Sequence, residues 1–167
     1  MTYQAFPRST VIYNVSALSG ILVLGGVVAA QIGLWFVVGY TLLILVSVAG
    51  VLSTVCARCS YYGHRCGLGL GWVVARLFGR RPGEAYFRTP MQFVYLGLLL
   101  VGLAWPLVGS ARLLAQGYNV ARLVELVAVV GLLLALAVPH PRLVCRHCRQ
   151  GACGACPVGR MVRGTDQ

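Results

Sequence analysis

Residues 11–30 read VIYNVSALSGILVLGGVVAA, and residues 34–55 read LWFVVGYTLLILVSVAGVLSTV. Each run is long enough to cross the hydrocarbon core of a bilayer as a helix, which takes about 20 apolar residues. Only Gln31, Ile32 and Gly33 separate the two runs. The sequence here therefore predicts an antiparallel pair of transmembrane helices that are joined by a tight turn.

Two more apolar runs follow, at residues 91–114 and 120–138. Pro90 precedes the third run, in a position where proline favours the start of a helix. Pro106 lies inside the third run and is expected to kink that helix. Pro139 closes the fourth run. Together the four runs predict a bundle of four transmembrane helices.

The composition points to the same class of protein. Hydrophobic residues make up 59% of the 167 residues and charged residues only 10%, whereas a soluble domain has about 25% charged residues. Such a chain cannot cover a water-facing surface with polar groups. We therefore expect an all-α membrane protein. Its four-helix transmembrane domain spans residues 1–138 and includes a cysteine-rich loop at 56–89, and a cysteine-rich tail follows at 139–167.

The basic residues predict the orientation of this bundle. All fourteen are arginines, and they give the chain a net charge of +11. None lies in the turn at 31–33, and only Arg112 and Arg122 flank the turn at 115–119. By the positive-inside rule, both termini and the loop at 56–89 are cytoplasmic. The other arginines all lie at this expected cytoplasmic side: Arg8, Arg58, Arg65, Arg76, Arg80, Arg81, Arg88, Arg142, Arg146, Arg149, Arg160 and Arg163.

The seven cysteines fall in two clusters outside the apolar runs. A Cys-x2-Cys pair can hold one metal ion from a single turn, and four thiolate or imidazole ligands complete the tetrahedron that zinc prefers. Structural disulfides are rare in the reducing cytoplasm, where clustered cysteines more often bind metal. We therefore expect two zinc sites. The loop set is Cys56, Cys59, His64 and Cys66, and the tail set is Cys145, Cys148, Cys153 and Cys156. The spacing leaves open that the loop pair and the tail pair share one ion.

Part of the tail suggests a different cofactor. The stretch from Cys148 to Cys156 has Cys-x4-Cys-x2-Cys spacing with intervening glycines, and it resembles the cluster loop of plant-type [2Fe–2S] ferredoxins. The resemblance covers nine residues and implies an iron–sulfur cluster and an electron-transfer role. The family's fourth cysteine lies well downstream, whereas only eleven residues follow Cys156, so Cys145 would have to replace it. An iron–sulfur cluster in the tail is therefore the alternative to zinc.

A second resemblance concerns location. The motifs Cys-x2-Cys-Ser-Tyr-Tyr-Gly-His-x-Cys-Gly, which begins at Cys56, and Cys-Pro-x-Gly-Arg, which begins at Cys156, are similar to motifs of small prokaryotic membrane proteins. This resemblance implies a multi-pass protein of a prokaryotic inner (plasma) membrane. It implies no particular activity.

The segment after Cys66 is both apolar and basic. It contains the apolar residues Trp72, Val73 and Leu77 and the basic residue Arg76. Two further arginines, Arg80 and Arg81, follow. Such a segment is typical of a short helix that lies in the plane of the lipid headgroups, with its arginines near anionic lipid phosphates. The alternative interpretation is an ordinary basic inner loop.

Several function classes lack the residues that they need. No histidine lies in an apolar run, which excludes a bis-His haem inside the bundle. Three acidic residues in the whole chain leave little for acid–base catalysis, so we expect no enzyme. Of these, Glu125 is expected to pair with Arg122 near a helix end. The remaining hypotheses are a metal-bound structural cap that docks a partner or belongs to a larger membrane complex, an iron–sulfur electron-transfer subunit, and a thiol redox or metal-handling protein.

Overall fold

The computed structural model describes residues 4–81 and 90–148, and this part of the chain is helical with no strand. Its four long helices are each long and apolar enough to cross a membrane. The predicted four-helix membrane bundle is thus confirmed, and the chain is a multi-pass membrane protein. The long helices are α1 (Arg8–Ile32), α2 (Leu34–Thr54), α4 (Pro90–Gln116) and α5 (Val120–Ala137).

Local residues set the ends of these helices. Gly33 alone separates α1 from α2, and its φ of 150° is one that glycine adopts most readily. Asn119 caps α5, because its side-chain oxygen accepts a hydrogen bond from the backbone N–H of Ala121 at 2.9 Å. At the other end of α5, Pro139 begins the short helix α6 (Pro139–Leu143). The fourth run is expected to end before Pro139, and α5 does end there, at Ala137. Proline is compatible with the first turn of the helix that follows.

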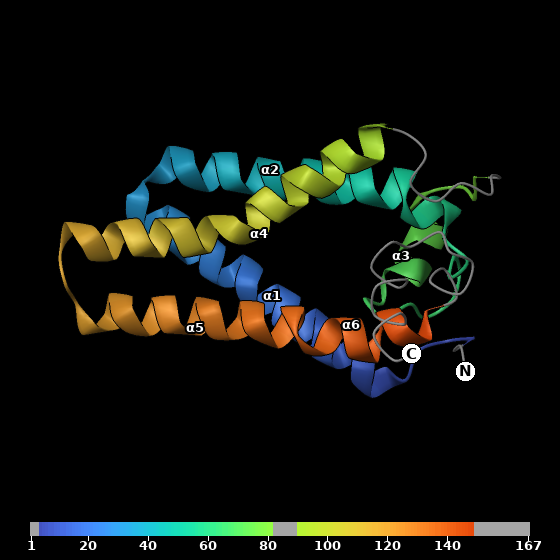
Figure 1. The fold of residues 1–167 in the computed structure, drawn as a ribbon. Helices are drawn as coiled ribbons and strands as arrows, with labels where there is room; N and C mark the ends of the chain where they lie inside the picture. The colour runs from blue at the N-terminus through green and yellow to red at the C-terminus, as the bar shows by residue number, and fades with distance from the viewer. Residues whose placement is uncertain (1–3, 82–89, 149–167) are drawn as a thin grey trace.

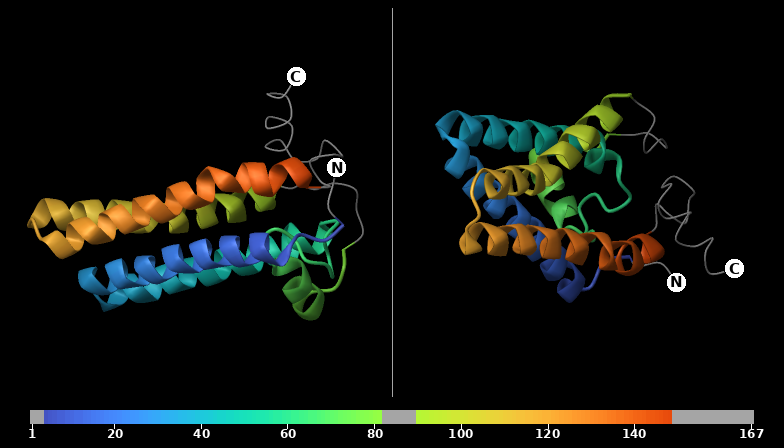
Figure 2. Two further views of the ribbon diagram at one scale, coloured as in Figure 1. Left: turned by 90° about the horizontal axis from the view of Figure 1, so that it is seen from below. Right: turned by 60° about the vertical axis from the view of Figure 1, so that its left-hand side comes forward.

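The four long helices form two layers (Figure 2). One layer is the hairpin of α1 and α2, and the other is the hairpin of α4 and α5. Each hairpin is closed at its turn, and its two helices diverge toward the opposite end, so that α4 lies beside α2 and α5 beside α1 (Figure 1). Pro106 lies inside α4 as expected, and α4 changes direction near its middle (Figure 1).

We call the end of the bundle that carries the two hairpin turns the turn end, and the opposite end the cap end. At the turn end Gln31 donates to both carboxylate oxygens of Glu125, at 3.1 and 3.3 Å. Arg122 donates instead to the backbone oxygens of Leu113 and Gly117, at 2.7 and 3.1 Å. The expected pairing of Arg122 with Glu125 is therefore wrong. The carbonyls at the end of α4 bind the guanidinium because no later helical residue donates to them.

Two buried amides join the helices toward the cap end. The side-chain oxygen of Asn14 accepts a hydrogen bond from the ring Nδ1–H of His140 at 2.9 Å and so links α1 to α6. Gln92 donates to the backbone oxygen of Thr54 at 2.9 Å and links α4 to α2. Both amides are fully buried. Such polar contacts between helices stabilise bundles in a membrane, where no water competes for them.

The cap end is formed by the N-terminal segment, the loop after α2 and the segment after α5 (Figure 1). The loop holds the 3-10 helix η1 (Cys56–Arg58) and the helix α3 (Leu70–Leu77), and α6 is followed by the 3-10 helix η2 (Cys145–His147). The expected short helix after Cys66 is thus present as α3. All the cysteines that the structure describes lie in the loop and in the segment after α5, and Cys56 and Cys145 begin the two 3-10 helices.

Candidate metal centre

The first cysteine pair of the loop lies in a tight turn directly after α2. Val55 continues the helical backbone, η1 ends at Arg58, and Cys59 after it has an extended backbone. The N–H of Cys59 donates to the oxygen of Cys56 at 3.1 Å. The N–H of Tyr61 reaches back to the sulfur of Cys59 at 3.5 Å. Backbone N–H groups that donate to a cysteine sulfur favour the thiolate form that binds metals.

The first cysteine pair of the tail repeats this turn. Val144 precedes η2 with backbone angles close to those of Val55, and Cys148 is extended like Cys59. The N–H of Cys148 donates to the oxygen of Cys145 at 3.3 Å. Two separate Cys-x2-Cys pairs therefore have the same local fold, and each follows the end of a membrane-spanning segment.

The rest of the loop folds back onto its own backbone. His64 donates its N–H to the oxygen of Tyr61 at 2.9 Å, and Gly63, whose φ is 79°, donates to the oxygen of Gly71 at 3.0 Å. Gly71 fits closely beneath this turn, because a Cβ atom there would overlap the backbone oxygens of Tyr61 and His64. These contacts fix Cys66, which is half-buried, relative to the first cysteine pair.

Loop and tail meet in a small apolar cluster, which we call the bridging cluster. It consists of the buried side chains of Phe6, Tyr61 and Val144, with the rings of Phe6 and Tyr61 5.3 Å apart. The N-terminal segment is held there as well, since the N–H of Phe6 donates to the oxygen of Arg65 at 3.0 Å. Three cysteines pack against the bridging cluster, two from the loop and one from the tail: Cys59, Cys66 and Cys148.

Cys56 lies beyond the end of α2, outside the membrane-spanning helix, and packs against a second cluster of Leu52, Ala57 and Val74. Burial raises the pKa of its thiol to about 12, and the neighbouring thiols of Cys66 and Cys59 contribute to the rise. The three loop cysteines are therefore close enough to interact electrostatically.

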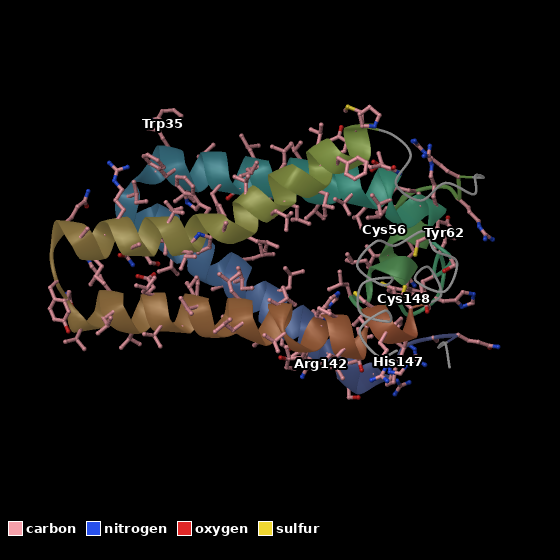
Figure 3. The ribbon with its side chains drawn as sticks, in the orientation of Figure 1. Trp35, Cys56, Tyr62, Arg142, His147 and Cys148 are labelled. Carbon is pink, nitrogen blue, oxygen red and sulfur yellow. The ribbon has the colours of Figure 1, made fainter. Side chains whose placement is uncertain are left out.

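The expected metal ligands differ in their exposure to solvent. Figure 3 shows Cys56 beyond α2 and Cys148 beyond η2, both at the cap end. His64, by contrast, is exposed to solvent. Within residues 4–81 and 90–148, no three histidine, cysteine or acidic side chains are arranged to hold a metal ion. The tail ligands Cys153 and Cys156 lie outside the described residues.

Sequence reasoning did not identify the residues that join loop to tail. Phe6, Tyr61 and Val144 are apolar residues with no motif of their own, and they are far apart in the sequence. The only local signal is the position of Val144, which precedes Cys145 as Val55 precedes Cys56.

A second candidate site lies toward the turn end, between α2 and α4. It is an apolar hollow of about 190 Å³. Its lining offers almost no polar surface, and the tryptophan at its rim is 83% exposed where lipid would surround it. A hollow of this kind suits lipid chains and lacks the polar groups that fix a specific ligand. Its lining residues are Trp35, Phe36, Gly39, Tyr40, Leu43 and Trp105.

No protein family, no curated protein and no solved structure matches this chain.

Proposed function

We propose that this chain is an integral membrane metal-binding protein, in which zinc bound by cysteines of the loop and tail holds the cap end together. The metal is structural in this proposal, and the cap docks a protein partner or serves as part of a small subunit in a membrane complex. The arginine distribution supports a cap that faces the cytoplasm. The resemblance to small prokaryotic membrane proteins supports a location in the inner membrane.

The observation that carries the proposal is the pair of matched cysteine turns beside one apolar cluster. The turns at Cys56–Cys59 and Cys145–Cys148 have the same backbone hydrogen bond, at 3.1 and 3.3 Å. Cys59, Cys66 and Cys148 also pack against the same three buried side chains. Because zinc sites are commonly built from two such turns, this placement supports a metal that ties loop to tail.

The donor chemistry also favours zinc in a structural role. Thiolates bind zinc strongly, and zinc has no redox chemistry and accepts tetrahedral thiolate or imidazole sets. The small apolar clusters at the cap end give a limited core, which is the situation in which a bound metal adds folding stability. The proposed ligands are the four residues of the loop set and the four of the tail set, so the full chain is expected to bind about two zinc ions.

The test is anaerobic purification of the full chain, followed by elemental analysis and a visible spectrum. The proposal expects colourless protein with about two zinc ions per chain. Brown protein with iron and sulfide would favour the electron-transfer alternative, since iron–sulfur clusters absorb visible light. Protein without metal, whose cysteines all react rapidly with a maleimide, would contradict both and favour the thiol redox alternative.

Single substitutions then locate the ligands. Cys59→Ser is expected to lower the zinc content by about one ion, and Ser60→Ala, at the exposed neighbouring residue, serves as the control. His64→Ala tests the exposed histidine. If His64→Ala leaves zinc unchanged while Cys59→Ser and Cys148→Ser each remove the same ion, loop and tail share one site. If His64→Ala releases an ion that Cys148→Ser retains, the two sets are separate.

A further inference from the structure

Helix α3 presents two different faces. Gly71 and Val74 are buried, and Val74 packs against Leu52 and Ala57. Away from this contact the helix is open: Trp72 is 52% exposed and Leu77 is 65% exposed. Large apolar side chains with this exposure on a helix of eight residues need an apolar environment outside the protein.

The contacts of α3 place it at the depth of a membrane boundary. Leu52, which packs against Val74, belongs to the last turn of α2. At the other end of α3, a Cβ atom on Gly69 would lie 3.0 Å from Val11, in the first turn of α1. The helix therefore runs between the end of one span and the start of another, where lipid headgroups surround a transmembrane bundle.

The orientation of α3 agrees with this depth. Figure 2 shows α3 at the cap end of the α1–α2 layer, on the side away from α4 and α5. Its exposed side chains form two neighbouring rows with helical spacing. Trp72 and Arg76 form one row, and Val73 and Leu77 form the other. An apolar row beside a row of tryptophan and arginine is the pattern of a helix that lies in the interface.

The charge on this surface is positive. The guanidinium carbon of Arg76 lies 3.4 Å from the centroid of the Trp72 ring, and this stacking orders both side chains at the surface. Arg80 and Arg81 follow directly and are exposed. Among the described residues the cap end carries no carboxylate, because Glu125 lies at the turn end. The exposed surface of α3 and the residues that follow it is therefore positively charged.

We propose that α3 is a lipid-binding helix, with Trp72, Val73 and Leu77 in the interface and Arg76, Arg80 and Arg81 on the phosphates of anionic phospholipids. The membrane is favoured over a soluble protein partner because α3 lies beside the ends of α1 and α2 rather than beyond them. This inference does not depend on the metal proposed above. Each arginine near a membrane surface is worth about 1 kcal/mol of attraction to anionic lipid, or about fivefold in local enrichment.

The test uses the full chain in vesicles of phosphatidylcholine and phosphatidylglycerol, in which one lipid or the other is brominated near the headgroup end of the acyl chains. The fluorescence of Trp72 is isolated by comparison with Trp72→Phe. The proposal expects the quenching of Trp72 to increase when the bromine is moved from phosphatidylcholine to phosphatidylglycerol at the same brominated fraction. In Arg76→Gln/Arg80→Gln, this increase is expected to fall at least fivefold.

Arg8→Gln/Arg142→Gln is the matched control, because it removes two exposed arginines from the cap end without touching α3. This control variant is expected to show the same increase in Trp72 quenching as the unmodified chain. Two results would overturn the proposal. One is a Trp72 signal quenched by aqueous iodide but not by brominated lipid, which would place α3 in water or against a protein. The other is lipid quenching that does not change with phosphatidylglycerol or with the arginine variants.

Discussion

At the scale of single residues, the fold of the loop depends on Gly71. A Cβ atom on this residue would overlap the backbone oxygens of Tyr61 and His64, which cannot move without opening the turn between the loop cysteines. We therefore expect Gly71→Ala to destabilise the cap end by about 1–3 kcal/mol. The measurement is the rate of maleimide labelling at Cys56 and Cys66 in detergent, which rises as the turn opens.

Gly79→Ala is the control for this prediction. Gly79 also follows the loop cysteines, but a Cβ atom there would meet nothing within 4 Å. Its labelling rate is expected to match that of the unmodified chain. Equal labelling rates in Gly71→Ala and Gly79→Ala would show that the close fit of Gly71 beneath the turn does not stabilise the cap end.

The residue scale also shows which features of the site the sequence could predict. The turn around Cys56 and Cys59 depends on hydrogen bonds between residues three apart, so the Cys-x2-Cys spacing is enough to predict it. The contact of Phe6 with Tyr61 depends on the approach of separate segments, and no local pattern encodes that. His64 matched the expected spacing, yet it is exposed, because spacing does not determine which side of a turn a side chain occupies.

At the scale of elements, the long helices could be predicted well because each one satisfies its own backbone hydrogen bonds and needs only apolar side chains to lie in lipid. Hydropathy alone placed the start of α2 at Leu34 and that of α5 at Val120, as the structure has them. The pairing of the helices could not be predicted in this way, because lipid and a neighbouring helix are equally apolar surroundings. Close packing at small residues determines it instead.

The contact between α2 and α4 gives a prediction at this scale. A Cβ atom on Gly50 would overlap the ring of Tyr95, whereas one on Gly97 would meet nothing within 4 Å. Gly50→Ala is therefore expected to destabilise the bundle by about 1–3 kcal/mol, because the helices must separate. Gly97→Ala is expected to be neutral or more stable by up to about 1 kcal/mol, since alanine is the better helix former. The free energy of unfolding in mixed detergent measures both, and a larger loss for Gly97→Ala would contradict the packing described here.

At the scale of the whole molecule, the fold brings three distant segments to one end. The hairpins are closed at the turn end and diverge at the cap end, where the bridging cluster of Phe6, Tyr61 and Val144 joins the N-terminal segment, the loop and the tail. The cysteines that the structure describes are therefore brought to one end by the four-helix topology. With an even number of spans, this gathering requires the loop and both termini to share one side of the membrane.

The orientation of that side is the last prediction. Twelve of the fourteen arginines belong in sequence to the N-terminal segment, the loop at 56–89 and the tail at 139–167. Arg122 at the turn end is held by the backbone oxygens of Leu113 and Gly117. Because arginines near span ends are retained in the cytoplasm, fusions of green fluorescent protein after Gly79 and after Gln167 are expected to fluoresce in a bacterial host. Alkaline phosphatase fused at Gly33 or Gly117 is expected to be active, and fused at Gln167 inactive. The opposite pattern would place the cysteines in an oxidising compartment, where disulfides would replace the proposed zinc ligands.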